Sequence, residues 1–294
     1  MDFVVRILSH GGVLFMRLIA PLPLPVVRGM GWLLGQLLYL LIWPRRKIVR
    51  VNLSLCFPEM PLNQRHQLER QVFVRFAQAW LDRSWLWHGS REQLAKRLKV
   101  TGDVKALREQ PHLVLFSPHF VGLDAGGVAI TKEKLRPLCS IYSSQRNAIV
   151  DEWILQGRLR FGGLRLFARM EGVREIAASV ETGEALYLLP DMDFGTHGAE
   201  FVPFFGVNAA TVTSLSRFAR LCKAKVITLS NRMTSEGYEV NFSQPWSDFP
   251  NRDARADTER MNRELQALVL QAPDQYYWVH KRFKTRPPGE PSVY

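Results

Sequence analysis

Residues 113–124 read LVLFSPHFVGLD, an apolar run that ends in a polar turn. Four large apolar residues followed by Ser-Pro predict a short buried strand that stops near Pro118. His119 then stands in the turn, and Asp124 follows five positions later. Five positions along a helix correspond to a rotation of about 500°, so the two side chains cannot share one helical face. We therefore expect His119 in the turn and Asp124 in the first turn of a following helix.

The His119–Asp124 pair has the residue types of a general base and its orienting carboxylate. An imidazole can take a proton from a hydroxyl near neutral pH, and a carboxylate fixes its tautomer and stabilises the imidazolium. A histidine near an aspartate also occurs in purely structural roles, so the pair alone leaves both interpretations open. The sequence has no GxSxG elbow, phosphate-binding loop or HExxH motif. This favours direct attack by a substrate hydroxyl over an enzyme-bound intermediate.

Beyond residue 100, apolar runs alternate with helical stretches. The apolar runs lie at 113–117, 137–141, 185–189 and 225–230, and the helical stretches at about 145–161, 172–182, 211–222 and 254–271. This alternation predicts an α/β fold with a mixed, largely parallel sheet flanked by helices. Ligands of such folds bind beyond the carboxyl ends of the strands, where polar turns meet. Residues 62–88 predict one long amphipathic helix ahead of this region.

Residues 1–50 are strongly apolar and predict a membrane-associated helical arm. Residues 29–43 read GMGWLLGQLLYLLIW without a charge, which is short of the roughly 20 residues that a spanning helix needs. A snorkelling Arg28 would bring the run near that length. The arm is then a tilted span or an interfacial helix, and a buried hairpin of core helices is the alternative. If it spans, the basic cluster at 45–50 places residues 51–294, a helical lead-in plus the catalytic domain, on the cytoplasmic side.

The chain is strongly basic, with a net charge of +12 and a pI near 10.0. This balance indicates an anionic partner, such as nucleic acid, anionic lipid or a phosphorylated substrate. Aromatic and basic residues interleave at 275–286, QYYWVHKRFKTR, in a pattern that imitates a nucleic-acid surface. The FVPFFG segment at 201–206 would line an apolar channel or lie in the core. Together with the apolar arm, it favours an anionic lipid over nucleic acid as the partner. Three separated cysteines argue against a disulfide framework or a thiolate metal site.

Two further polar elements are candidate binding groups. Asp191 and Asp193 stand in LLPDMDFG, where an apolar run again ends in a turn. Arg158 stands in GRLRFGG, and its planar guanidinium suits phosphate or carboxylate recognition. Turn capping by the aspartates and an exposed helix end at Arg158 are the alternatives. We expect no metal, because no histidine or third acid stands nearby at ligand spacing.

These motifs together resemble those of the bacterial lipid A biosynthesis acyltransferases of the lauroyl and myristoyl type. The HxxxxD box, the GRxRxG element, the PDxDxG segment, the FVPFFG run and the ending HKRFKTRP carry the resemblance, which spans nearly the whole chain. The HxxxxD box alone is shared with the wider superfamily of glycerolipid and lysophospholipid acyltransferases. The resemblance therefore implies a glycerolipid acyltransferase-like fold.

The resemblance implies an enzyme of lipopolysaccharide biosynthesis on the cytoplasmic face of the bacterial inner membrane. It would move a fatty acyl chain from acyl carrier protein to a hydroxyl of an anionic lipid A precursor, with the carrier thioester as co-substrate and without cofactor or metal. His119 would be the base and Asp124 its partner, while Arg158, Asp191 and Asp193 would bind or orient substrate. Many family members carry glutamate at the position of Asp124. A lysophospholipid acyltransferase and a non-catalytic membrane-binding basic protein are the alternatives, and nucleic acid is not an expected partner.

Overall fold

The structure is a computed structural model that describes residues 3–168 and 172–294. Its strands are β1 (Leu98–Gly102), β2 (Leu113–Phe116), β3 (Leu138–Tyr142), β4 (Leu164–Ala168), β5 (Ala185–Leu188), β6 (Ala199–Phe204), β7 (Val207–Val212), β8 (Lys225–Met233) and β9 (Tyr238–Phe242). Within the described residues, seven of them form one sheet in the order β1-β9-β8-β2-β5-β3-β4, and β6 pairs with β7. In the large sheet the β8–β9 pair is antiparallel and the other neighbouring pairs are parallel. The predicted mixed, largely parallel sheet is confirmed.

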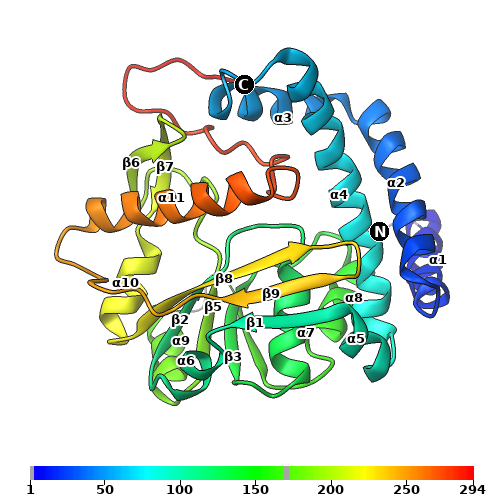
Figure 1. The fold of residues 1–294 in the computed structure, drawn as a ribbon, viewed down its shortest axis with the longest axis horizontal. Coiled ribbons are helices and arrows are strands. Elements are labelled where there is room, and N and C mark those ends of the chain that lie inside the picture. Colours follow the sequence, from blue (N-terminus) through cyan, green and yellow to red (C-terminus); the bar gives the residue numbers. More distant parts are fainter. Residues whose placement is uncertain (1–2, 169–171) are drawn as a thin grey trace.

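Helices cover both faces of this sheet (Figure 1). They are α1 (Phe3–Ile19), α2 (Leu24–Leu41), α3 (Trp43–Cys56), α4 (Leu62–His88), α5 (Arg91–Arg97), α6 (Val104–Glu109), α7 (Leu123–Lys132), α8 (Ala148–Arg158), α9 (Val173–Glu181), α10 (Ser214–Leu221) and α11 (Ala254–Gln271). The predicted helices at 62–88 and 254–271 match the bounds of α4 and α11. The apolar run at 29–43 is not one helix, because the chain breaks at Ile42 and Pro44 opens α3.

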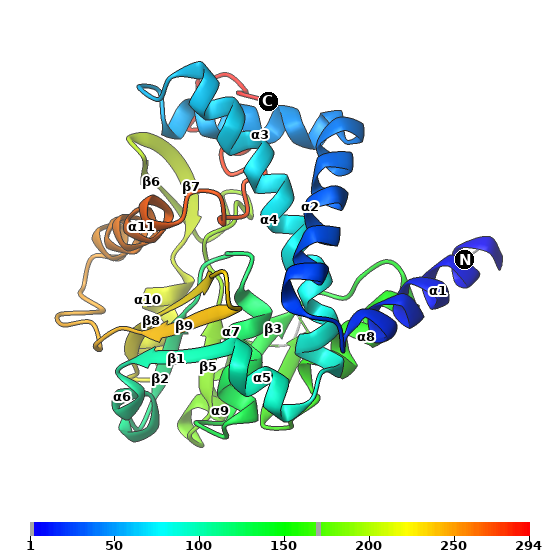
Figure 2. The ribbon, with the colours of Figure 1, turned by 45° about the vertical axis from the view of Figure 1, so that its right-hand side comes forward.

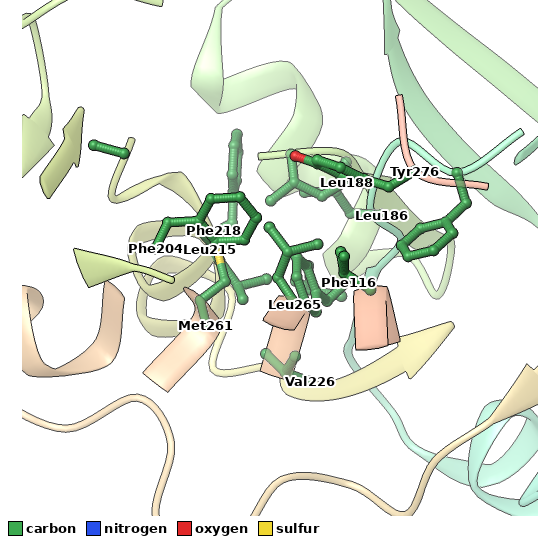
Figure 3. Packing of buried hydrophobic residues seen from close by; sticks show 14 of the residues in the cluster. Phe116, Leu186, Leu188, Phe204, Leu215, Phe218, Val226, Met261, Leu265 and Tyr276 are labelled. Atoms are coloured by element: carbon green, nitrogen blue, oxygen red, sulfur yellow. The ribbon is translucent and has the colours of Figure 1, made fainter. Parts of the chain in front are cut away.

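Strand β2 is apolar at every position because both of its faces are buried. Val114 and Phe116 join a core cluster under α9, α10 and α11, whereas Leu113 and Leu115 join a cluster under α6 and α7. Successive side chains of a strand point to opposite faces, and both faces here are covered. Figure 3 shows the first cluster, in which Met261 and Leu265 of α11 face the sheet residues.

The segment FVPFFG at 201–206 forms the end of β6 and its turn into β7. Phe204 has no exposed surface and packs against Tyr276, Trp278 and Phe283. The sequence left two interpretations of this segment, a channel lining and a part of the core. The burial of Phe204 supports the core. Trp278 and Phe283 are also fully buried, so these aromatic residues of the stretch at 275–286 belong to the core.

Helix α2 packs lengthwise on α4, and α1 contacts α4 and α8 (Figures 1 and 2). Glycines permit the close approach, since a β-carbon on Gly31 would lie 2.7 Å from the Gln78 Cα and one on Gly35 would lie 2.5 Å from the Val74 Cα. Arg28 does not snorkel as expected. Its Nε instead donates to Asp82 Oδ2 at 2.8 Å, and its Nη atoms donate to backbone carbonyls of the β8–β9 turn. The buried Asp82 carboxylate therefore has a cation as its partner, as a buried charge requires.

The outer faces of α1 and α2 remain apolar and exposed. Phe3, Leu8 and Leu18 on α1, and Leu33 and Leu40 on α2, each expose more than half of their surface. Helix α2 is long and apolar enough to cross a membrane by length and composition, as a buried core helix also can be, although 22% of it is buried inside the protein. The arm is thus a helical layer that is fastened to α4 on one side and presents an apolar surface on the other.

Candidate active site

His119 and Asp191 lie in the turns that follow two adjacent parallel strands. Phe116, the last residue of β2, pairs with Leu188, the last residue of β5. Each of the two turn residues comes three positions after the last residue of its strand. Because parallel strands end at the same edge of a sheet, equal offsets bring the two side chains together.

The His119 ring is held by Asp191 in a charge-assisted contact. Nδ1 of His119 lies 2.8 Å from Oδ1 of Asp191, and the backbone N–H of His119 donates to Oδ2 at 3.0 Å. The Asp191 side chain is fully buried, and the His119 side chain keeps 20% of its surface exposed. Burial alone would raise the pKa of Asp191, but the nearby His119 charge and its hydrogen bonds hold that pKa below the ordinary value.

Asp124 lies in the first turn of α7, as the spacing predicts, but its carboxylate binds two arginines. Oδ2 accepts from Arg83 Nε of α4 at 2.8 Å, and Oδ1 accepts from Arg158 Nε of α8 at 2.8 Å. Burial opposes the charge of Asp124, yet the two guanidinium groups outweigh it and lower the pKa to about 2. The site therefore contains a permanently charged Arg–Asp–Arg group.

The expectation that Asp124 orients His119 does not match these hydrogen bonds. Asp191, expected to bind substrate, has the orienting position, and Asp124 instead organises Arg158. The physical reason is the direction in which each side chain points. At the start of α7 the Asp124 side chain faces α4 and α8, whereas the turn after β5 directs Asp191 at His119. Sequence reasoning also missed Arg83, which no local motif marks.

Asp193 shapes the turn after β5. Its carboxylate accepts from the backbone of Gly195 and from both the backbone N–H and the hydroxyl of Thr285, and only 4% of the residue is exposed. The backbone N–H of Asp193 donates to Nε2 of His280 at 3.0 Å. Burial, aided by the charge of Arg282, lowers the pKa of His280 to about 4, so this ring is a neutral acceptor.

The C-terminal segment also holds the His119 turn in place. The backbone N–H of Tyr277 donates to the His119 carbonyl at 2.9 Å, and that of Val121 donates to the Gln275 carbonyl at 2.9 Å. A bridge between Phe120 and Tyr276 lies between these two bonds. The turn that carries His119 is therefore held by a segment near the C-terminal end of the chain.

A cavity of about 790 Å³ opens beside His119. Apolar side chains from α7, β3, β4 and the end of β5 form much of its wall, namely Val128, Leu138, Leu164, Leu166, Leu188 and Leu189. Gly127 faces open space, since a β-carbon there would meet no atom within 4 Å. Asp124, Arg158 and Tyr277 line the same cavity as His119. The space combines the His119 imidazole with an apolar trough that is large enough for an alkyl chain.

The described residues hold no group of three His, Cys, Asp or Glu side chains that could bind a metal ion.

The family model of the bacterial lipid A biosynthesis acyltransferases matches residues 2–285 of the chain. The chain belongs to this family. It is 32% identical over 286 residues to a lipid A biosynthesis acyltransferase of Haemophilus influenzae, covering 95% of this chain and 88% of the relative. It is 30% identical to the lipid A biosynthesis lauroyltransferase of Escherichia coli, covering 96% and 93% of the two chains. The match to the Escherichia coli myristoyltransferase, also at 30%, covers 85% and 78%.

Family membership makes this chain an acyltransferase of lipid A biosynthesis. The crystal structure of a 1-acyl-sn-glycerophosphate acyltransferase from Thermotoga maritima aligns with 84% of this chain and 96% of its own, at 12% identity and a TM-score of 0.37. The candidate site in this chain is described by the side chains of His119, Asp191, Asp124 and Arg158.

Proposed function

We propose that this chain transfers a fatty acyl group from acyl carrier protein to a hydroxyl of a lipid A precursor, with His119 as the general base. The observation that carries the proposal is the His119–Asp191 pair at the wall of an apolar cavity. The names of the relatives, which include lauroyl-, palmitoleoyl- and myristoyltransferases of lipid A biosynthesis, support the acyl donor class and the acceptor.

In the proposed reaction, Asp191 accepts the Nδ1–H of His119, which leaves Nε2 as the proton acceptor. Nε2 removes the proton of the acceptor hydroxyl while the oxygen attacks the thioester carbon. The new C–O bond forms, the C–S bond breaks, and the imidazolium returns its proton to the departing thiolate. No bond to the enzyme is formed, which agrees with the lack of a nucleophile motif in the sequence.

Arg158 is the group that we assign to the developing oxyanion. It lines the cavity, and Asp124 holds its Nε. A fixed guanidinium in a cavity of low polarity stabilises negative charge without having to reorganise. Asp193 shapes the turn in this proposal, and no cofactor takes part.

The apolar arm provides the membrane contact in the proposal. Exposed leucines and aromatic residues on α1 and α2 would enter the bilayer, and Arg45, Arg46 and Lys47 would meet anionic headgroups on the cytoplasmic face of the inner membrane. Asn147 donates to the Ser9 hydroxyl of α1 at 2.7 Å, and Ser143 and Gln145 of the same loop line the cavity. A lipid acceptor would thus reach His119 from the bilayer alongside α1.

The test uses the full chain in detergent or nanodiscs with acyl carrier thioesters of several chain lengths. A lipid A precursor should gain the mass of one acyl chain, and a lysophospholipid offered in its place should not. The His119→Ala variant, which should fold normally because its backbone contacts remain, should give no product. Acylation of the lysophospholipid alone would overturn the proposed acceptor, and full activity of the variant would overturn the role of His119.

A further inference from the structure

The rim of the cavity includes a basic side chain that the reaction does not use. The cavity is lined by Met192 and Phe194 from the turn after β5, by His197 and Gly198 farther along, and by Arg217 of α10. The Arg217 guanidinium lies beside Gly198, with Nη1 3.6 Å from the position of a β-carbon on that glycine. Arg217 and His197 are both exposed, so both reach solvent at the opening.

The charges around this rim favour an anion. Among the described lining residues the carboxylate is that of Asp124, which already binds Arg83 and Arg158. The Arg217 guanidinium has no ion-pair or hydrogen-bond partner among the described residues, and only the backbone N–H of Arg217 is bonded, to the Thr213 carbonyl. In contrast, Arg220, one turn along the same helix, donates to the Asn251 carbonyl and lies 3.7 Å from Asp257. The cavity thus has an excess of positive charge and an unused guanidinium at its mouth.

We propose that Arg217 and His197 form a subsite that binds a phosphate group of a substrate. The guanidinium presents N–H donors in a planar fork that matches phosphate oxygens, and the imidazole adds another donor. This inference rests on the proposed function, whose two substrates both carry phosphate. The phosphate comes either from the glycolipid acceptor or from the prosthetic group that links the acyl chain to its carrier.

The experiment compares Arg217→Gln, Arg217→Lys and His197→Asn with wild type, varying donor and acceptor separately. Loss of a charge-assisted hydrogen bond weakens binding about 10- to 100-fold. We therefore expect Arg217→Gln to raise KM about 10- to 100-fold for one substrate. Most of the loss should fall in KM, and Arg217→Lys should recover part of it as a point charge. The substrate whose KM rises identifies the source of the phosphate. If it is the acceptor, removing the responsible phosphate should abolish the difference between wild type and Arg217→Gln.

Arg263→Gln is the matched control, because Arg263 is exposed on α11 and lines neither this cavity nor the groove beside α11. It removes the same charge and should leave KM near the wild-type value. An equal rise in KM for this control would mean a general charge effect and would overturn the subsite.

Equilibrium binding of the phosphorylated acceptor alone, and of the acyl carrier alone, separates this inference from the proposed reaction. Loss of binding in Arg217→Gln supports the subsite even if wild type transfers no acyl group, which would defeat only the proposed reaction. Unchanged binding of both substrates, together with unchanged KM, would overturn the subsite while leaving the reaction intact.

Discussion

The Nδ1 atom of His119 lies 2.8 Å from Oδ1 of Asp191, although 72 residues separate them in the chain. The contact joins the ends of two adjacent parallel strands, β2 and β5. The carboxylate that orients the proposed base is therefore the aspartate of the PDxDxG segment and not that of the HxxxxD box.

Replacing Asp191 should lower kcat more than a conservative replacement of Asp124 does. In Asp191→Asn the amide cannot hold the same tautomer of His119, and we expect kcat to fall about 10²- to 10⁴-fold. Asp124→Glu keeps a carboxylate between Arg83 and Arg158 and should retain most of the activity. The measurement is acyl transfer with saturating substrates. Near wild-type kcat in Asp191→Asn would contradict the geometry.

Arg28→Ala should destabilise the fold, because it leaves Asp82 buried without its cation. Asp82 has no exposed surface, and Tyr238 and Trp85 supply its other hydrogen bonds. Breaking a buried ion pair by removing one partner costs about 3 kcal/mol in the free energy of unfolding. Chemical unfolding in detergent measures the loss. Arg6→Ala, at an exposed position of α1, is the control and should leave the midpoint unchanged.

Gly35→Leu should separate α2 from α4, since a β-carbon at Gly35 would lie 2.5 Å from the Val74 Cα. Overpacking of this kind costs about 1–3 kcal/mol, and more where the backbone itself is in the way. Gly29 is the matched control on the same helix, because a β-carbon there meets no atom within 4 Å. We expect Gly29→Leu to keep the melting temperature. Equal melting temperatures for the two variants would show that α2 is not seated on α4 as described.

Gly127→Leu should fill part of the apolar trough without harming the fold. The site is open space on α7, and leucine favours a helix over glycine by about 1 kcal/mol. We expect kcat/KM to shift toward shorter acyl donors while stability is kept or improved. A donor series of increasing chain length checks this. An unchanged preference would mean that the acyl chain does not pass Gly127.

Acidification should destabilise the protein through His280. Its pKa is about 4 in the folded state against an ordinary value of 6.5, so the unfolded chain binds more protons between these values. Stability is therefore present above pH 6.5 and lost as the pH falls toward 4, by up to about 3 kcal/mol. Urea unfolding across this range measures the slope. His280→Asn has no group that titrates there and should show a flatter curve, and an equal slope in both proteins would exclude His280 as the cause.

Much of the fold could be predicted because its signals are local. The apolar runs at β2, β3, β5 and β8 predict strands, and the periodicity of 62–88 predicts α4. The position of His119 in a turn and of Asp124 in a following helix comes from spacing alone. The edge strands β1 and β4, and β9 next to β1, mix polar residues with apolar ones, so the sequence does not predict them.

The sequence by itself determined the strand-and-helix alternation, the position of His119 in a turn after a strand and, through its motifs, the family. Only the tertiary structure decided that β5 lies beside β2, which brings Asp191 to His119 and leaves Asp124 to Arg83 and Arg158. The physical reason is that local patterns fix each element, whereas strand order depends on how all the elements bury their surfaces together. The same holds for Arg28, whose partner on α4 becomes available only when the arm packs against the long helix.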